Sequence, residues 1–176
     1  MENTKSTLRN LIREQRRISR SNFDFSLITE LSEFKSARTI ASYRSYGDEP
    51  STLVLNQIIL SVGKELLLPA LKSDLGLEFR LWNGDPNSLK MNGNIEEPIG
   101  EEFKGVIDLM ITPALALDRN GNRLGQGGGS YDRALARFSG FSIALINEDE
   151  LLDTLPTEAS DRKVSAALTP TRLIRF

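Results

Sequence analysis

The chain is 176 residues long, with an apolar share of 39%, a charged share of 26% and a net charge of −2, which suits one globular domain around a sizeable core. It contains no cysteine and no histidine, and this excludes disulfides, thiol nucleophiles, the Ser-His-Asp triad and the usual zinc sites. No apolar run approaches the roughly 20 residues that span a bilayer, and the first residues lack the apolar core of a secretory signal, so we expect a cytoplasmic protein without membrane contact.

The first segment predicts an amphipathic helix over residues 4–20, because apolar residues recur at nearly helical spacing. Lys5, Arg9 and Arg13 are four residues apart and share one stripe of that helix. Residues 1–20 carry six basic and two acidic side chains, or +4, so the remainder sums to −6. Such a segment indicates an anion site or a nucleic-acid arm. We disfavour nucleic acid, because no aromatic residue precedes Phe23. The apolar residues are Leu8, Leu11, Ile12 and Ile18, and we interpret Arg16, Arg17 and Arg20 as a solvated face.

Turn residues and apolar runs divide residues 25–100 into short elements. A helix that begins after Ser51 or Thr52 should continue to about Ser61, and Gly63 marks its end. Residues 83–100 are rich in Gly, Asn and Pro and predict a loop. The other expected elements are a helix over 25–35, a strand over 39–45, a turn over 47–50, and strands over 65–69 and 77–82.

The second half of the chain starts with a long apolar run over 108–117, which is typical of one central strand. A glycine-rich loop follows over 118–129. The alternation of strands and helices implies a layered α/β domain with a mostly parallel sheet, formed by residues 1–176 as a single domain. The remaining elements are expected as helices over 130–138 and 148–153 and strands over 141–146, 164–168 and 173–176.

Five of the thirteen glycines fall between positions 121 and 129. Glycine lets a ligand approach backbone N–H groups closely, and a loop between a strand and a helix is a common phosphate site. Standard nucleotide motifs are absent, since the loop has no lysine and Ser130 replaces the third glycine of the dinucleotide motif. A plain flexible connection is the alternative. Asp132, just inside the helix, could hold a cation or complement the helix dipole.

Residues 108–135, DLMITPALALDRNGNRLGQGGGSYDRAL, resemble the signature of the 5-formyltetrahydrofolate cyclo-ligase family. That signature is a strand ending in Pro, then Asp, then Asn/Arg-Arg-Leu-Gly-x-Gly-x-Gly-x-Tyr-Asp. The resemblance implies a three-layer, Rossmann-like α/β domain whose mixed, mainly parallel sheet is flanked by helices. Weaker similarities lie at KSTLR (5–9), YRSYGDEPST (43–52), LLP (67–69), EP (97–98) and LPTEASD (155–161).

The same resemblance implies a cyclo-ligase that uses ATP and Mg²⁺ to convert 5-formyltetrahydrofolate into 5,10-methenyltetrahydrofolate, with release of ADP and phosphate. Its partners would be these small molecules, with no nucleic acid, and a monomer is expected. The implied catalytic residues are Arg123 and Tyr131, and the implied magnesium ligands are Asp132 and Asp161. The implied ATP site comprises Lys5, Arg9, Arg123, Leu124, Gly125, Gln126, Gly127, Gly128, Gly129, Ser130 and Tyr131, and the implied substrate site comprises Arg44, Glu49, Gln126, Gly127, Gly128, Gly129 and Ser130.

Several positions depart from the pattern of the family. Many members have Lys or Arg in the glycine loop where this chain has Gln126 and Gly128, so a phosphate contact is either missing or supplied by Arg123 or Arg133. Ser130 also replaces a common tyrosine. Two alternatives therefore stay open, namely a non-catalytic paralogue that binds nucleotide or folate, and an ATP-dependent enzyme acting on another heterocycle. Without the resemblance, Glu49 is equally well a turn acid before Pro50.

Overall fold

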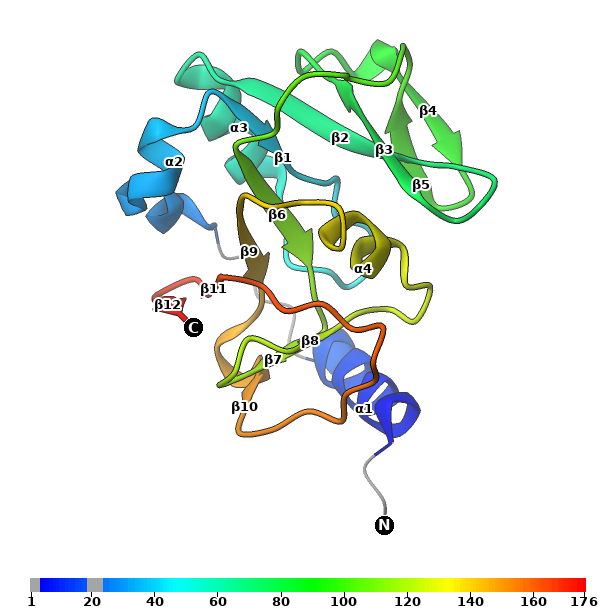
Figure 1. Ribbon diagram of the computed structural model, residues 1–176, viewed down its shortest axis with the longest axis vertical. Coiled ribbons are helices and arrows are strands. Elements are labelled where there is room, and N and C mark those ends of the chain that lie inside the picture. Colours follow the sequence, from blue (N-terminus) through cyan, green and yellow to red (C-terminus); the bar gives the residue numbers. More distant parts are fainter. Residues whose placement is uncertain (1–3, 19–23) are drawn as a thin grey trace.

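The computed structural model describes residues 4–18 and 24–176 (Figure 1). The first expected helix is confirmed as α1 (Lys5–Ile18), while its expected continuation through positions 19–20, including Arg20, lies outside the described residues. Within the described ranges, no helix is both long and apolar enough to cross a membrane.

A seven-stranded sheet forms the centre of the fold, in the order β12-β11-β9-β6-β1-β2-β3 (Figure 1). Its five inner strands run parallel, and the edge strands β3 and β12 pair antiparallel to their neighbours. The expected mixed, mainly parallel sheet is therefore confirmed. The strands span Thr39–Ala41 (β1), Glu65–Leu71 (β2), Leu77–Leu81 (β3), Leu109–Pro113 (β6), Phe141–Leu145 (β9), Ala166–Leu168 (β11) and Leu173–Arg175 (β12).

Helices cover both faces of this sheet and so complete three layers (Figure 1). Leu66 and Leu68 of β2 pack into the core that Leu55 of α3 closes, whereas Leu67 packs into the opposite core with Leu135 of α4. Successive residues of a strand point to opposite faces, which is why β2 is apolar at every inner position. The helices of these layers are η1 (Ser26–Glu30), α2 (Ser32–Ser36), α3 (Leu53–Ser61) and α4 (Ser130–Leu135).

α1 packs on a separate three-stranded sheet, β10-β7-β8, below the main sheet in Figure 1. Leu8 and Ile12 of α1 are buried against this small sheet. The interpretation of Leu11 and Ile18 as part of the apolar face is wrong, because they are 50% and 81% exposed. The buried stripe instead continues from Ile12 to Arg16, one turn further along. The small strands are Ala116–Asp118 (β7), Arg123–Leu124 (β8) and Leu151–Leu152 (β10).

Several expected elements differ from the structure. Two are shorter than expected, since the strand over 39–45 ends at Ala41 (β1) and the helix over 130–138 ends at Leu135 (α4). Residues 25–35 form two helices, η1 and α2, because Leu31 between them has an extended backbone (φ −67°, ψ 127°). Residues 83–100 are not a loop, since β4 and β5 pair there as an antiparallel hairpin. The run 108–117 divides into two strands, β6 and β7, which belong to different sheets. β6 ends at Pro113, which has no N–H group to donate to a neighbouring strand. The expected helix over 148–153 is only a short 3₁₀ turn, η3 (Glu148–Glu150), followed by the strand β10. The elements of the segment 83–100 are η2 (Pro86–Ser88), β4 (Leu89–Asn92) and β5 (Ile95–Pro98).

Candidate active site

A cavity of about 660 Å³ opens between α1, the glycine-rich loop, α4 and the β4–β5 hairpin. This volume is in the usual range for a small-molecule site. Every site residue that the resemblance implies lines this cavity, from Lys5 and Arg9 through Arg44 and Glu49 to Asp161. Residues far apart in the sequence therefore meet at one place.

The base of the glycine loop is shaped by Asp118, at the end of β7. Its carboxylate accepts hydrogen bonds from the backbone N–H groups of Asn120 (2.8 Å), Asn122 (3.0 Å) and Leu155 (3.1 Å). Burial raises the pKa of Asp118, but these bonds and one from the Asn122 side chain outweigh it, so the pKa is lowered. Gly121 completes the turn at φ +78°, and a Cβ there would lie 2.7 Å from the Val164 carbonyl oxygen. This acid therefore has a structural role in the motif.

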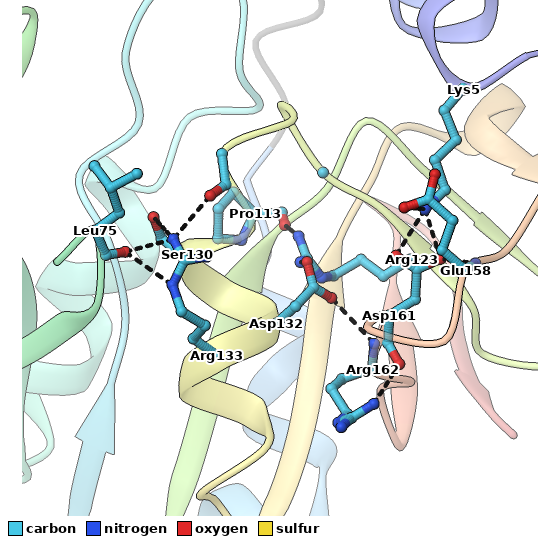
Figure 2. A network of polar contacts seen from close by, with 12 residues as sticks. Lys5, Leu75, Pro113, Arg123, Ser130, Asp132, Arg133, Glu158, Asp161 and Arg162 are labelled. Carbon is cyan, nitrogen blue, oxygen red and sulfur yellow. Dashed lines mark hydrogen bonds and ion pairs between the residues drawn. The ribbon is translucent and has the colours of Figure 1, made fainter.

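The loop itself is held by arginines from both sides. Arg9 Nε donates to the Gly125 carbonyl oxygen at 2.8 Å, and Arg13 bonds Gln126. On the other side, Arg133 of α4 donates to the carbonyl oxygens of Gly128 (2.8 Å) and Leu75 (2.7 Å), as Figure 2 shows. The positive charge expected from Arg133 is thus present at the loop.

Lys5 connects the start of α1 to the C-terminal segment (Figure 2). Its Nζ lies 2.7 and 2.6 Å from the two carboxylate oxygens of Asp161 and 3.4 Å from Glu158 Oε2. Burial raises the pKa of Asp161, but the bonds from Lys5 and the Glu158 N–H outweigh it and lower the pKa. Asp161 is therefore an anion at neutral pH, beside a cation on the cavity wall.

Arg123 of β8 lies in the wall of the cavity with its side chain almost fully buried. Nη1 donates to the Pro113 carbonyl oxygen (3.0 Å) and Nη2 to Asp132 Oδ2 (3.0 Å), while Asp132 Oδ1 accepts from the Arg162 N–H (3.1 Å). The guanidinium carbon lies 5.8 Å from the centre of the Tyr131 ring. Among the described residues, its buried Nε has no partner, and such a donor is costly until a ligand satisfies it.

Glu49 and two tyrosines form the polar part of the cavity next to the 47–50 turn, which is present as expected. Burial raises the pKa of Glu49, although bonds from the Tyr46 N–H and Gln126 oppose this. Burial and the Glu49 charge also raise the pKa of Tyr43 and Tyr131. The hydroxyls of both tyrosines are buried and lack a partner among the described residues, so they remain protonated donors near a carboxylate.

The β4–β5 hairpin supplies a wall that the sequence did not predict. Arg44, placed in the cavity as expected, forms an ion pair with Glu96 of β5 and lies 5.3 Å from the centre of the Trp82 ring. Glu97, buried on the same strand, accepts from the Leu71 N–H at 2.8 Å. The Asn-Gly turn before Ile95 is a hairpin signal that could have revealed this wall. The lining residues missed in this way are Asn92, Ile95 and Glu97.

Arg16 corrects a sequence prediction, because it is buried and not solvated. It is 5% exposed, and its Nε and Nη2 lie 2.6 and 2.7 Å from the carboxylate of Glu150, itself 4% exposed. Burial would lower the pKa of Arg16, but the bonds to Glu150 outweigh it, so the pKa is raised. Arg17 is 70% exposed, as expected for a solvated residue. The ion pair anchors α1 at the end opposite Lys5.

Two carboxylates on the cavity wall are candidate ligands for a divalent cation, and in this structure each is paired with a basic side chain, Asp132 with Arg123 and Asp161 with Lys5. Asp132 and Asp161 both line the cavity, and across residues 4–18 and 24–176 no cluster of three acidic, His or Cys side chains could hold a metal by itself. Mg²⁺ commonly takes one or two carboxylates and completes its shell with phosphate oxygens and water. The donor set therefore fits a magnesium ion that arrives with a nucleotide.

Comparisons with known proteins agree on one family. The model of the 5-formyltetrahydrofolate cyclo-ligase family matches residues 2–170. The 5-formyltetrahydrofolate cyclo-ligase of Mycolicibacterium smegmatis is 37% identical over 147 residues, which cover 78% of this chain and 76% of that protein. The Escherichia coli enzyme of the same name is 32% identical, with 78% and 80% covered. The NMR structure of Aquifex aeolicus 5,10-methenyltetrahydrofolate synthetase superimposes with a TM-score of 0.83 at 28% identity, covering 97% of this chain and 92% of that one.

Proposed function

We propose, since this chain belongs to the 5-formyltetrahydrofolate cyclo-ligase family, that it uses ATP and Mg²⁺ to close 5-formyltetrahydrofolate to 5,10-methenyltetrahydrofolate. The observation that carries this proposal is the cavity described above, which brings a glycine loop, basic side chains and two carboxylates together beside a third carboxylate, Glu49. We further propose that residues 1–176 act as one domain, as a monomer and in the cytoplasm.

The chemistry suits a site without histidine or cysteine. The formyl oxygen attacks the γ-phosphorus of ATP and ADP leaves. The folate N10 nitrogen then attacks the activated formyl carbon and gives up its proton to solvent, and the phosphorylated oxygen departs as phosphate. Phosphoryl transfer requires mainly positioning and charge neutralisation. The nitrogen and the formyl carbon belong to one molecule, so proximity contributes much of the second step.

In this proposal the basic side chains of the cavity bind the triphosphate of ATP. Lys5 and Arg9 bind phosphate oxygens, and residues 124–130 wrap the nucleotide with their backbone. Arg123 neutralises charge on the transferred phosphoryl group, supported by its unpartnered Nε and its position beside Tyr131. The hydroxyl group of Tyr131 donates a hydrogen bond to the reacting formyl group.

The folate occupies the part of the cavity around Glu49. Its carboxylate accepts two N–H bonds from the pterin ring, supported by its position beside two donor hydroxyls. Arg44 lines the same part, with its guanidinium fixed by Glu96 and Trp82. Asp132 and Asp161 would hold Mg²⁺, and the ion would supply neutralisation of the phosphate charge.

The direct test is the absorbance of the methenyl-folate product in a mixture of protein, 5-formyltetrahydrofolate, ATP and Mg²⁺. We expect a steady rise that disappears when ATP is left out or when the metal is removed with a chelator, and that returns when Mg²⁺ is added back. A folded protein that gives no rise, yet binds ATP or the folate, would point to the non-catalytic paralogue. A rise that needs no ATP would contradict the proposed phosphoryl transfer.

The metal role of Asp132 predicts a specific defect in Asp132→Asn. The amide keeps an acceptor for the Arg162 N–H but loses the negative charge, so the Mg²⁺ concentration that gives half-maximal rate should rise by roughly tenfold or more. Magnesium titrations at saturating ATP and folate measure this. Asp153→Asn, at an exposed acid paired with Arg119, is the control and should leave the requirement unchanged. An unchanged Mg²⁺ requirement in Asp132→Asn would remove this residue from the metal site.

A further inference from the structure

Arg13 is the one member of the basic stripe on α1 that does not line the cavity. Lys5 and Arg9, one and two turns earlier, do line it. The guanidinium of Arg13 instead makes three hydrogen bonds to one residue of the loop, Gln126. Nε donates to Gln126 Oε1 at 3.1 Å, and Nη2 donates to Oε1 at 2.7 Å and to the Gln126 carbonyl oxygen at 3.1 Å. Arg13 therefore reaches the site only through Gln126.

These bonds decide which way the Gln126 amide points. A glutamine side chain has one acceptor oxygen and one donor NH₂ group. Because Oε1 is occupied by a cation, the NH₂ group is left for the opposite side, where it acts on the carboxylate of Glu49, which lines the same cavity, and opposes the rise in the pKa of that carboxyl group. The reverse orientation would place the NH₂ group against Arg13 and the oxygen against Glu49, which is unfavourable at both ends.

Glu49 has few other groups that favour its charge. The Tyr46 N–H donates to its Oε2 at 3.2 Å, and Arg16 on α1 attracts it. Tyr43 and Tyr131 face it with buried hydroxyls, and Tyr46 also lies close to it. Burial works against the anion, so the Gln126 amide is one of a small set of groups that favour the charged form of the carboxylate.

We propose that Arg13 is a positioning residue for the folate, which locks the Gln126 amide so that it orients the Glu49 carboxylate toward the pterin. This inference rests on the proposed function, because it gives Arg13 an effect on the folate that Glu49 is proposed to bind. A smaller effect on ATP is expected, because Arg13 also bonds the Gln126 carbonyl oxygen in the loop that is proposed to wrap the nucleotide.

The test is Arg13→Met, which keeps most of the side-chain stem and removes the guanidinium. We expect the KM for 5-formyltetrahydrofolate to rise about tenfold, while kcat and the KM for ATP stay within about twofold. The acidic limb of the pH profile of kcat/KM for the folate should move to higher pH, because the Gln126 amide is no longer held where it favours the Glu49 anion. A loss of packing alone would not separate the two substrates in this way.

Two further variants calibrate the result. Arg17→Met removes the same charge from an exposed position of the same helix and should change neither KM. Glu49→Gln should raise the folate KM at least as much as Arg13→Met does. A raised ATP KM with an unchanged folate KM would show that Arg13 binds phosphate and would overturn the proposal, as would a variant indistinguishable from Arg17→Met.

Failure of the proposed function gives a different pattern. Binding of the folate to the wild-type chain is measured by calorimetry beside the turnover assay. A wild type that neither binds nor converts the folate would overturn the proposed function, and the role of Arg13 with it. An active wild type whose folate affinity survives Arg13→Met would overturn the role of Arg13 alone.

Discussion

Replacing Arg123 with lysine is expected to lower kcat by about 1,000-fold, or about 4 kcal/mol of transition-state stabilisation. The guanidinium donates hydrogen bonds to the Pro113 carbonyl oxygen and to Asp132 from two different nitrogens. Its third nitrogen, Nε, is buried and has no hydrogen-bond partner among the described residues. A lysine ammonium is a point charge and cannot keep this fork while it also reaches a phosphoryl oxygen. Retained charge with lost geometry should therefore affect the chemical step more than binding of either substrate.

Single-turnover and steady-state kinetics with saturating ATP and folate measure this effect. Arg119→Lys is a matched control, because Arg119 lies in the same β7–β8 connection but is exposed and paired only with Asp153. A thermal melt of each variant separates lost activity from lost folding. If Arg123→Lys retains more than about a tenth of the wild-type kcat, the role of the guanidinium in phosphoryl transfer is wrong.

The sequence predicted most of the fold because its patterns are local. The order of strands and helices follows from apolar runs and turn residues, and the strand order of the sheet agrees with a mostly parallel α/β domain. The errors occur where tertiary contacts override a local pattern. Between Asp108 and Leu117 every residue except Thr112 is apolar, and only the pairing of β7 with β8 and β10 shows that this run contributes to two sheets.

The site was predicted more completely than the contacts within it. The glycine loop and its flanking residues form a specific family signature, and the residues that the family resemblance assigned to the site all line one cavity. The hairpin wall was missed because Gly, Asn and Pro in 83–100 resemble an irregular loop when the pairing of β4 with β5 is unknown. Arg16 was missed for a physical reason, namely that its partner Glu150 lies 134 residues away and no local pattern connects them.

That pair carries the largest expected effect on stability. Replacing Arg16 with methionine should lower the free energy of unfolding by about 3–5 kcal/mol, because it leaves Glu150 buried without its cation. Arg16 also donates to the Ala114 carbonyl oxygen at 2.7 Å, and this bond would be lost as well. The Asn147 N–H (2.8 Å) and its side-chain amide (2.9 Å) still reach Glu150, but neutral donors compensate a buried anion only in part. Urea unfolding at constant m-value measures the change.

Two variants distinguish the buried pair from the charge of the helix. Arg17→Met removes a neighbouring charge that is exposed and makes one long contact, 3.5 Å from Nε to Asp48 Oδ2. It should lower the free energy of unfolding by less than about 0.5 kcal/mol. The double variant Arg16→Met with Glu150→Gln keeps an acceptor for Asn147 and removes the unpaired anion, so it should recover at least half of the loss. If Arg16→Met is no less stable than Arg17→Met, the pair does not anchor α1. The packing of Leu8 and Ile12 and the polar contacts of the basic stripe would then hold the helix in place.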